Sequence, residues 1–254
     1  GVAFAIEELA NAFEQRVAML VMTAILISGI VSLGIAGDYV YFGTMARTLG
    51  FSRALLIAPL AGVLGGLSGA LFARLVLAIT YQRRRYLGPL AKRPILWAAL
   101  CGLAIAAIGI LTGVTWGTGY AEAKAAVEGV HESLWFGPAK FVSTLLSTIA
   151  GLPGGIFSPS LATGAGIGNL LCLLFPNDPR GAVVLLGMIA YFTGVARAPL
   201  TAVIIIMEAT ASRGMVLPLF ASALIADFSA RLVCRDKLYH ALAREFLPGR
   251  GQPE

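Results

Sequence analysis

The chain has 254 residues, of which 58% are hydrophobic and only 13% are charged. Soluble domains of this length usually have about a quarter of their residues charged. The composition therefore excludes an ordinary water-facing surface and indicates a membrane protein. The formal net charge is +6, but the basic residues lie at the ends of apolar segments and are not interleaved with aromatic side chains. This distribution argues against nucleic-acid binding and is typical of loops beside membrane helices.

The first eight residues form a short apolar segment that ends in Glu7 and Glu8. They contain no initiator Met and no basic region, so they are not a signal peptide. We expect the chain to begin inside an apolar helix of a longer protein. Residues 17–35, 54–81 and 94–114 are then predicted to cross a bilayer, because a crossing takes about 20 apolar residues.

The apolar segments beyond residue 114 are shorter, and Gly or Pro marks most of their boundaries. Helices are predicted at residues 136–150, 159–175, 182–196, 199–210, 216–233 and 239–246. Short helices at membrane depth leave free backbone groups, which only protein or a wet cavity can satisfy. Discontinuous helices of this kind indicate a transport site.

The charged loops predict an orientation in the membrane. The loop from Arg83 to Arg93 and the C-terminal region are rich in Arg and Lys, whereas the loop after residue 114 contains Glu122, Glu128 and Glu132. Basic loops tend to lie on the cytoplasmic side. We therefore place the Arg83–Arg93 loop and the C-terminus in the cytoplasm, and the acidic loop outside.

A weak repeat suggests that the protein is built from two halves. Residues 2–7 and 203–208 are both short apolar runs that end in a glutamate. Two-fold internal repeats are common in transporters. We assign residues 1–15 to the end of a first repeat, 16–36 to its closing transmembrane helix, 51–236 to a second repeat, and 237–254 to a cytoplasmic helix and tail. Cys101, Cys172 and Cys234 lie far apart in apolar runs, where we expect small core residues and neither a disulfide nor a metal site.

The most informative segment is residues 151–160, with the sequence GLPGGIFSPS. Gly154 and Gly155 allow a positive φ or the close approach of a ligand. Ser158 suits the N-cap of a helix, and Pro159 suits its first position. The N-terminus of such a helix offers free amides and a positive dipole end to an anion. A capped helix beside a tight turn explains the same residues, and local chemistry leaves both interpretations open.

The segment Gly155-Ile156-Phe157-Ser158-Pro159 resembles the G-x-F-x-P signature of the CLC family of chloride channels and chloride/proton antiporters. Residues 1–8, 151–154, 197–208 and 237–239 resemble other segments of that family in the same order. The resemblance implies an all-α, polytopic membrane protein with an inverted-repeat fold and tilted, broken helices. It also implies a homodimer, with residues 17–35, 199–210 and 216–233 at the interface.

The resemblance also implies functional roles. Backbone amides of Ile156 and Phe157 would bind chloride, and the hydroxyl of Tyr239 would donate to the same ion. Without the resemblance, an interfacial aromatic near a helix end is the preferred interpretation of Tyr239. Glu8 matches the internal proton-transfer glutamate of the antiporters, which predicts chloride/proton exchange, while Glu7 is expected to be structural. Chloride is then the substrate, and no cofactor is expected. The family's gating glutamate and serine loop would precede Gly1, so the isolated chain is not expected to transport.

Three alternatives remain from the sequence. The chain can be a passive voltage-gated chloride channel of the same fold, or a fluoride-selective relative. An enzyme is also conceivable, because residues 66–69 fit the G-x-S-G pattern of intramembrane serine proteases. That chemistry needs a histidine to activate Ser68, and only His131 and His240 are available. We instead interpret Gly62, Gly65, Gly66 and Gly69 as a close helix-packing face.

Overall fold

Helices are the regular secondary structure of the part of the chain that the computed structural model describes. This part comprises residues 15–37, 40–45, 47–82, 92–152, 154–210 and 212–246, together with residues 3, 7 and 88. No strand occurs among these residues, which confirms the predicted all-α class.

Within the described residues, four helices are long and apolar enough to cross a membrane by length and composition. They are α2 (Gln15–Ala36), α3 (Phe51–Tyr81), α5 (Pro94–Thr112) and α11 (Val216–Val233). Each coincides within a few residues with an apolar segment predicted from the sequence. α3 is the longest, with 31 residues and Pro59 inside it.

The other helices are shorter. They are α6 (Tyr120–Val127), α7 (Phe136–Ile149), α8 (Phe157–Leu171), α9 (Arg180–Ala196), α10 (Pro199–Thr210), the 3-10 helix η3 (Arg213–Met215) and α12 (Leu238–Phe246). α6 was not predicted, because its sequence YAEAKAAV is not an apolar run, although alanine favours helix. α8 ends at Leu171, earlier than the predicted residue 175.

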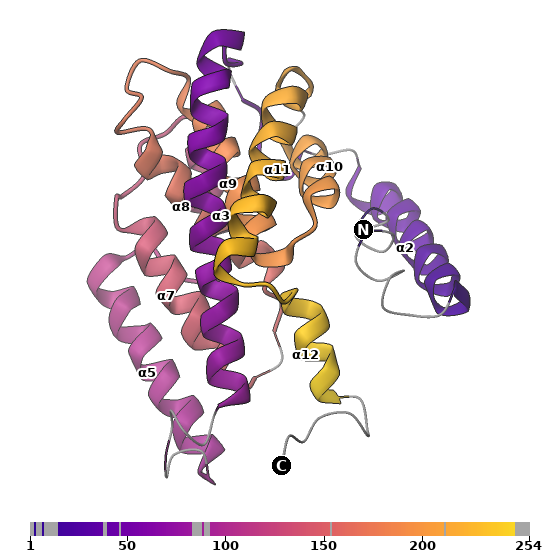
Figure 1. Ribbon diagram of the computed structural model, residues 1–254, viewed down its shortest axis with the longest axis vertical. Coiled ribbons are helices and arrows are strands. Elements are labelled where there is room, and N and C mark those ends of the chain that lie inside the picture. The colour runs from indigo at the N-terminus through magenta and orange to yellow at the C-terminus, as the bar shows by residue number, and fades with distance from the viewer. Residues whose placement is uncertain are drawn as a thin grey trace.

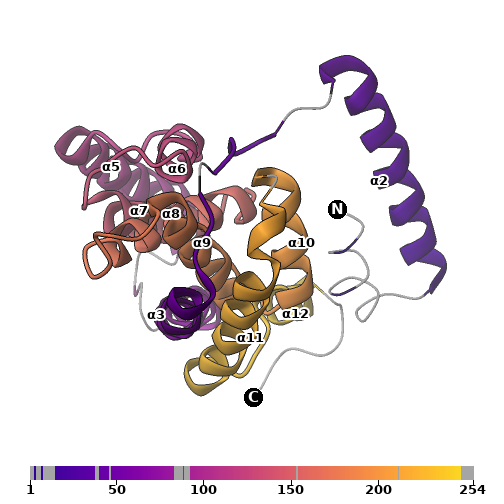
Figure 2. The same cartoon turned by 90° about the horizontal axis from the view of Figure 1, so that it is seen from above.

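α9 is the central helix of the bundle. All of its residues from Gly181 to Ala196 are buried. It packs against α3, α8 and α11, which surround it in Figures 1 and 2. A helix that is apolar on every side is expected at such a position, and α9 therefore forms the scaffold on which α8 is placed.

Small residues let α3 approach its neighbours closely. A Cβ atom added at Gly66 would lie 2.7 Å from the Cα atom of Ala226 in α11. A Cβ atom added at Gly65 would lie 2.7 Å from the backbone nitrogen of Tyr191 in α9. These contacts confirm the predicted packing face, and they show that it serves two partner helices.

α2 lies apart from the other helices, as Figure 2 shows. None of the 18 residues of its most apolar window, Met19–Ala36, is buried. The hydrophobic effect disfavours contact between so much apolar surface and water. α2 therefore presents its surface to lipid or to another polypeptide surface.

Ion pairs fix the ends of several helices. Arg53, in the first turn of α3, donates from Nε and Nη2 to the two carboxylate oxygens of Asp178, at 3.0 and 2.7 Å. Arg197, directly after α9, donates from Nε to Asp227 of α11 at 2.6 Å. The first pair connects α3 to the turn before α9, and the second connects the end of α9 to α11.

The three cysteines are free thiols. Cys101 and Cys172 are buried, as expected of small core residues, whereas Cys234 is partly exposed after the end of α11. The described residues include no group of three His, Cys, Asp or Glu side chains placed to hold a metal ion.

Candidate functional site

The start of α8 differs in register from the prediction. The helix begins at Phe157, with Ile156 as its N-cap residue, and no side chain caps it. Ser158 and Pro159 are therefore the second and third helical residues, so the predicted N-cap and first position are wrong. The cause is local: Ile156 already has a right-handed helical conformation and accepts the first helical hydrogen bond, from the Ser160 amide at 3.0 Å.

This register places the Ser158 amide before the first hydrogen bond inside the helix. The next residue, Pro159, has no N–H group, and the helical bonds begin at Ser160. The helix has 15 residues, and the positive end of its dipole lies at this first turn. The N-terminus of α8, the kind of helix end that favours an anion, therefore lies at Phe157, the second of the two residues predicted from the sequence.

One of the two predicted reasons for glycine at positions 154 and 155, a positive φ, does not hold in the structure. Gly154 and Gly155 do not have a positive φ; that conformation occurs at Gly151, where φ is 84° just after α7. A Cβ atom at Gly154 or Gly155 would meet no atom within 4 Å. Backbone conformation therefore does not require glycine at these two positions. The other predicted reason, the close approach of a ligand, remains a prediction.

The predicted anion ligands come from two regions of the fold. The ring of Phe157 packs edge-on against Phe192 of α9, with 4.5 Å between ring centroids. Phe157 and Tyr239 both pack, partly buried, against the main hydrophobic core, whereas Ile156 packs against a second core with Leu238. α12, which contains Tyr239, is attached to α3 by a hydrogen bond of 2.6 Å from the Tyr81 hydroxyl to the Ala241 carbonyl.

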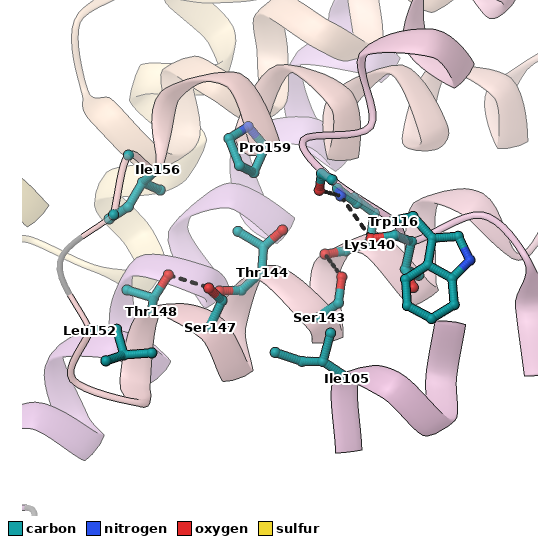
Figure 3. Close-up of a pocket in the computed structure, with 14 residues that line it drawn as sticks. Ile105, Trp116, Lys140, Ser143, Thr144, Ser147, Thr148, Leu152, Ile156 and Pro159 are labelled. Atoms are coloured by element: carbon teal, nitrogen blue, oxygen red, sulfur yellow. Dashed lines mark hydrogen bonds between the residues drawn. The ribbon is translucent and has the colours of Figure 1, made fainter. Parts of the chain in front are cut away.

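A cavity of about 390 Å³ lies beside the glycine turn. Figure 3 shows it along α7, with Pro159 of α8 on one side and Ile105 of α5 on the other. Figure 3 shows Ile156 at one end of the cavity and Lys140 and Trp116 at the other, and Gly154, Gly155 and Pro159 also line it. The sequence prediction missed Lys140, although a lysine inside an otherwise apolar helical segment was a signal that could have found it.

Of the two adjacent glutamates, Glu7 and Glu8, the structure describes only Glu7. The carboxylate of Glu7 accepts hydrogen bonds from the amides of Leu200 and Thr201, at 3.2 and 2.6 Å. These amides belong to the first turn of α10, so Glu7 caps that helix, which agrees with its predicted structural role. Glu8, the predicted proton-transfer residue, lies outside the described residues, as does Pro153.

The geometry offers no support for the serine protease alternative. The Ser68 hydroxyl donates to the Leu64 and Gly65 carbonyls of its own helix, at 2.7 and 3.0 Å. A catalytic serine instead has its hydroxyl bonded to an activating base. The G-x-S-G pattern here belongs to the packing face of α3.

The acidic loop before α7 gives a pH-dependent prediction. Burial raises the pKa of Glu132, and the negative charge of Glu122 raises it further. An acid with a raised pKa loses its proton first in the unfolded state, so folding stability falls as the pH rises from the ordinary pKa of glutamate to the raised one. Glu132→Gln should therefore be more stable than the wild type at neutral pH, measured by thermal unfolding in detergent.

The difference between Glu132→Gln and the wild type should vanish in acid, where Glu132 is protonated in both states. Glu122→Gln should make folding stability depend less on pH, because it removes the negative charge that adds to the raised pKa of Glu132. Equal melting temperatures for Glu132→Gln and the wild type at every pH would contradict this prediction.

The fold and the site together define a multi-pass membrane protein with broken helices around a polar cavity. The sequence profile described as "Voltage gated chloride channel" matches residues 1–231. The chain belongs to the voltage-gated chloride channel family, as the resemblance implied. Membership of this family and the apolar helices make it an integral membrane protein.

Curated relatives are named as exchangers. The chain is 28% identical over 268 residues to the H(+)/Cl(-) exchange transporter ClcA of Yersinia pestis bv. Antiqua (strain Angola), covering 99% of this chain and 55% of that protein. It is 27% identical over 253 residues to ClcA of Salmonella paratyphi A (strain ATCC 9150 / SARB42), covering 95% and 54%. The chain thus spans about half the length of these relatives, which are transporters and not enzymes.

Solved structures share the fold. A slow cyanobacterial Cl-/H+ antiporter aligns with a TM-score of 0.74 at 24% identity, covering 98% of this chain and 60% of that one. A eukaryotic CLC transporter aligns with a TM-score of 0.65 at 26% identity, covering 95% and 42%. The predicted CLC-type helical fold is therefore confirmed.

Proposed function

We propose that the chain forms one half of a pathway that exchanges chloride for protons across a membrane. The observation that carries the proposal is the start of α8, a 15-residue helix whose N-terminus, with the positive end of its dipole, adjoins a cavity lined by Gly154, Gly155 and Ile156. Amides at a helix N-terminus attract an anion without a full positive charge. Such a site binds chloride while still allowing it to leave, as conduction requires.

The anion ligands in this proposal are backbone amides and one hydroxyl. In this proposal the amides of Ile156 and Phe157 face chloride, and we add the Ser158 amide because α8 begins at Phe157. Gly154 and Gly155 leave room for the ion, since neither position has an atom within 4 Å of an added Cβ. Tyr239 supplies a phenolic donor. Chloride enters as substrate, and no cofactor takes part.

The proton route in this proposal passes through Glu8. Its neighbour Glu7 is occupied as the cap of α10, so Glu8 is the member of the pair that we assign to proton transfer. An internal carboxylate with a raised pKa binds and releases protons near neutral pH. The names of the curated relatives, H(+)/Cl(-) exchange transporters, support coupled exchange.

The test is transport by the native protein in liposomes under a chloride gradient. The wild type should move protons against chloride, and Glu8→Gln should keep the anion flux while proton movement stops. Glu7→Gln is the matched control: it removes the cap of α10, so it should lower the melting temperature and leave the coupling of the folded protein in place. Proton pumping by Glu8→Gln at the wild-type ratio would exclude Glu8 as the transfer residue.

The passive channel is the second candidate, because the matching family is described as a channel family. A fluoride-selective relative is the third, since the chain also aligns with a CLC-type fluoride/proton antiporter with a TM-score of 0.61 at 20% identity. Reversal potentials separate the candidates. A channel would follow the chloride gradient alone, an exchanger would also respond to the proton gradient, and a fluoride antiporter would prefer fluoride over chloride.

Dimerisation remains a proposal. α2 and α11 expose large apolar side chains, among them Ile30, Ile35, Leu217 and Phe228. We propose that α2, α10 and α11 form the interface of a homodimer within the lipid bilayer. The Arg83–Arg93 loop and the C-terminus are proposed to face the cytoplasm.

A further inference from the structure

α5 begins beside an open hollow on the surface of the bundle. The hollow has a volume of about 520 Å³, within the range of about 300–1,000 Å³ that is usual for ligand pockets. Only Cys101 and Gly109 of α5 are buried, and the helix lies at the edge of the bundle in Figures 1 and 2. The hollow is lined by Lys92, Arg93, Pro94, Ile95, Leu96 and Ala99.

The two cations of the hollow have no anionic partner within the described part of the chain. Lys92 and Arg93 are both exposed, and neither belongs to the three ion pairs that the described residues form. The sequence from Gln82 to Ala121 contains no Asp or Glu. Basic residues directly beside a membrane helix attract the headgroups of anionic lipids. The charge of the hollow therefore selects an anionic group.

An exposed apolar stripe extends from the hollow along α5. Leu96, Leu100 and Leu103 are all exposed, and their spacing of four and three residues puts them on one side of the helix. In a bilayer, a stripe of this kind contacts the acyl chains of lipids. A molecule with an anionic end and a long apolar tail therefore matches the hollow and the stripe together.

Trp97 indicates the depth of this end of α5 in the membrane. Its indole Nε1 donates to the carbonyl of Ile149, the last residue of α7, at 2.9 Å. Tryptophan is enriched at the level of the lipid headgroups. Lys92 and Arg93 precede Trp97 in the chain, and the stripe follows it towards the hydrocarbon. The cations thus lie where a headgroup lies, and a lipid bound here holds α5 against α7.

We propose that the hollow at the start of α5 binds one anionic phospholipid of the surrounding bilayer. The lipid phosphate contacts Lys92 and Arg93, and one acyl chain lies along Leu96, Leu100 and Leu103. Arginine pairs with phosphate through two N–H groups, and lysine adds a second positive charge. The site therefore prefers phosphatidylglycerol, which carries a net negative charge, over phosphatidylcholine, whose choline group cancels the charge of the phosphate.

Native mass spectrometry of the detergent-purified protein tests this preference. Titrated with the two lipids, with the same acyl chains in each, the native protein should retain phosphatidylglycerol more strongly. Lys92→Gln and Arg93→Gln should each weaken phosphatidylglycerol binding by about fivefold, the usual contribution of one Lys or Arg near an anionic lipid surface. Arg47→Gln is the matched control, because Arg47 is exposed before α3 and does not line the hollow. It should bind phosphatidylglycerol as the native protein does.

Thermal unfolding gives an independent measurement. A ligand that binds only the folded state stabilises that state, so phosphatidylglycerol should raise the melting temperature of the native protein more than that of Lys92→Gln or Arg93→Gln. Both side chains are exposed, so neither substitution should prevent folding. Equal stabilisation and equal retention of phosphatidylglycerol in all three variants would overturn the proposed site.

Glycerol phosphate distinguishes a lipid from a free phosphate group. It has the same anionic group without acyl chains, so at equal concentration it should not displace phosphatidylglycerol from the native protein. Displacement would show that the stripe contributes nothing, and would overturn the assignment to a lipid. The lipid site does not depend on which ion the protein transports. Its failure would therefore leave chloride exchange in place, and a failure of exchange would leave the lipid site in place.

Discussion

Asp227→Ala should destabilise the protein by about 3–5 kcal/mol, the usual cost of removing one partner from a buried ion pair. The Asp227 carboxylate accepts a hydrogen bond of 2.6 Å from Arg197 Nε, and Arg197 is only 8% exposed. Without Asp227, this guanidinium stays buried with one remaining described bond, from Nη1 to the Cys234 carbonyl at 3.0 Å. Thermal and denaturant unfolding in detergent would measure the loss.

The chain contains a matched control for this variant. Arg231 donates to the same carboxylate, at 2.6 Å, but its side chain is 63% exposed. Exposed pairs four residues apart on a helix contribute about 0.3–0.5 kcal/mol. Arg231→Ala should therefore change stability little. Equal losses for Asp227→Ala and Arg231→Ala would show that burial of Arg197 does not determine the effect.

The same pair connects the core to the helix that contains Tyr239. Arg197 follows α9 in a left-handed conformation with φ of 58°, and its bond to Cys234 fixes the segment between α11 and α12. Loss of Asp227 should therefore increase hydrogen exchange in α12 more than in α5, which this network does not contact. Under the proposed function, the chloride ligand Tyr239 would be displaced together with α12.

The bilayer-crossing helices were predictable because their signal is local. About 20 apolar residues in sequence are enough to indicate a crossing helix, and α3, α5 and α11 follow that pattern closely. The short helix α6 was missed because alanine, lysine and glutamate favour helix without forming an apolar run. Composition therefore located the membrane-spanning segments better than the polar ones.

The start of α8 shows why a local capping pattern is insufficient. Ser-Pro fits the N-cap and first positions, but proline is also compatible with the third position, whose amide needs no acceptor inside the helix. The sequence contained both registers, and the conformation of Ile156 selects the earlier one. The presence of a helix after the glycine turn was therefore predictable, whereas the residue at which this helix begins was not.

Lys140 shows that contacts between residues distant in the sequence could not be predicted from the sequence. Its two carbonyl partners, Thr115 and Gly117, lie more than 20 residues earlier, in the loop between α5 and α6. No periodicity in α7 indicates that this loop returns to the helix. The cavity that Lys140 lines arises only when α5, α7 and α8 pack together.

Gly66→Ala should destabilise the bundle by about 1–3 kcal/mol, the usual cost of one extra carbon in a packed interior. The added methyl group would lie 2.5 Å from the carbonyl oxygen and 2.7 Å from the Cα atom of Ala226. Both atoms belong to the backbone of α11, which cannot rotate away as a side chain can. The loss should appear although alanine favours helix over glycine by about 1 kcal/mol.

Gly102→Ala is the matched control, because it makes the same change in α5, where an added Cβ would meet no atom within 4 Å. Helix propensity then acts alone, and this variant should equal or exceed the wild type in melting temperature. Because Gly66→Ala should lower stability and Gly102→Ala should not, the two variants together separate the effect of interhelical distance from the effect of helix propensity. If Gly66→Ala were as stable as Gly102→Ala, α3 and α11 would have room to separate, and the glycine face would not determine their spacing. A loss in Gly66→Ala alone would show that the close approach of α3 and α11 requires glycine at position 66.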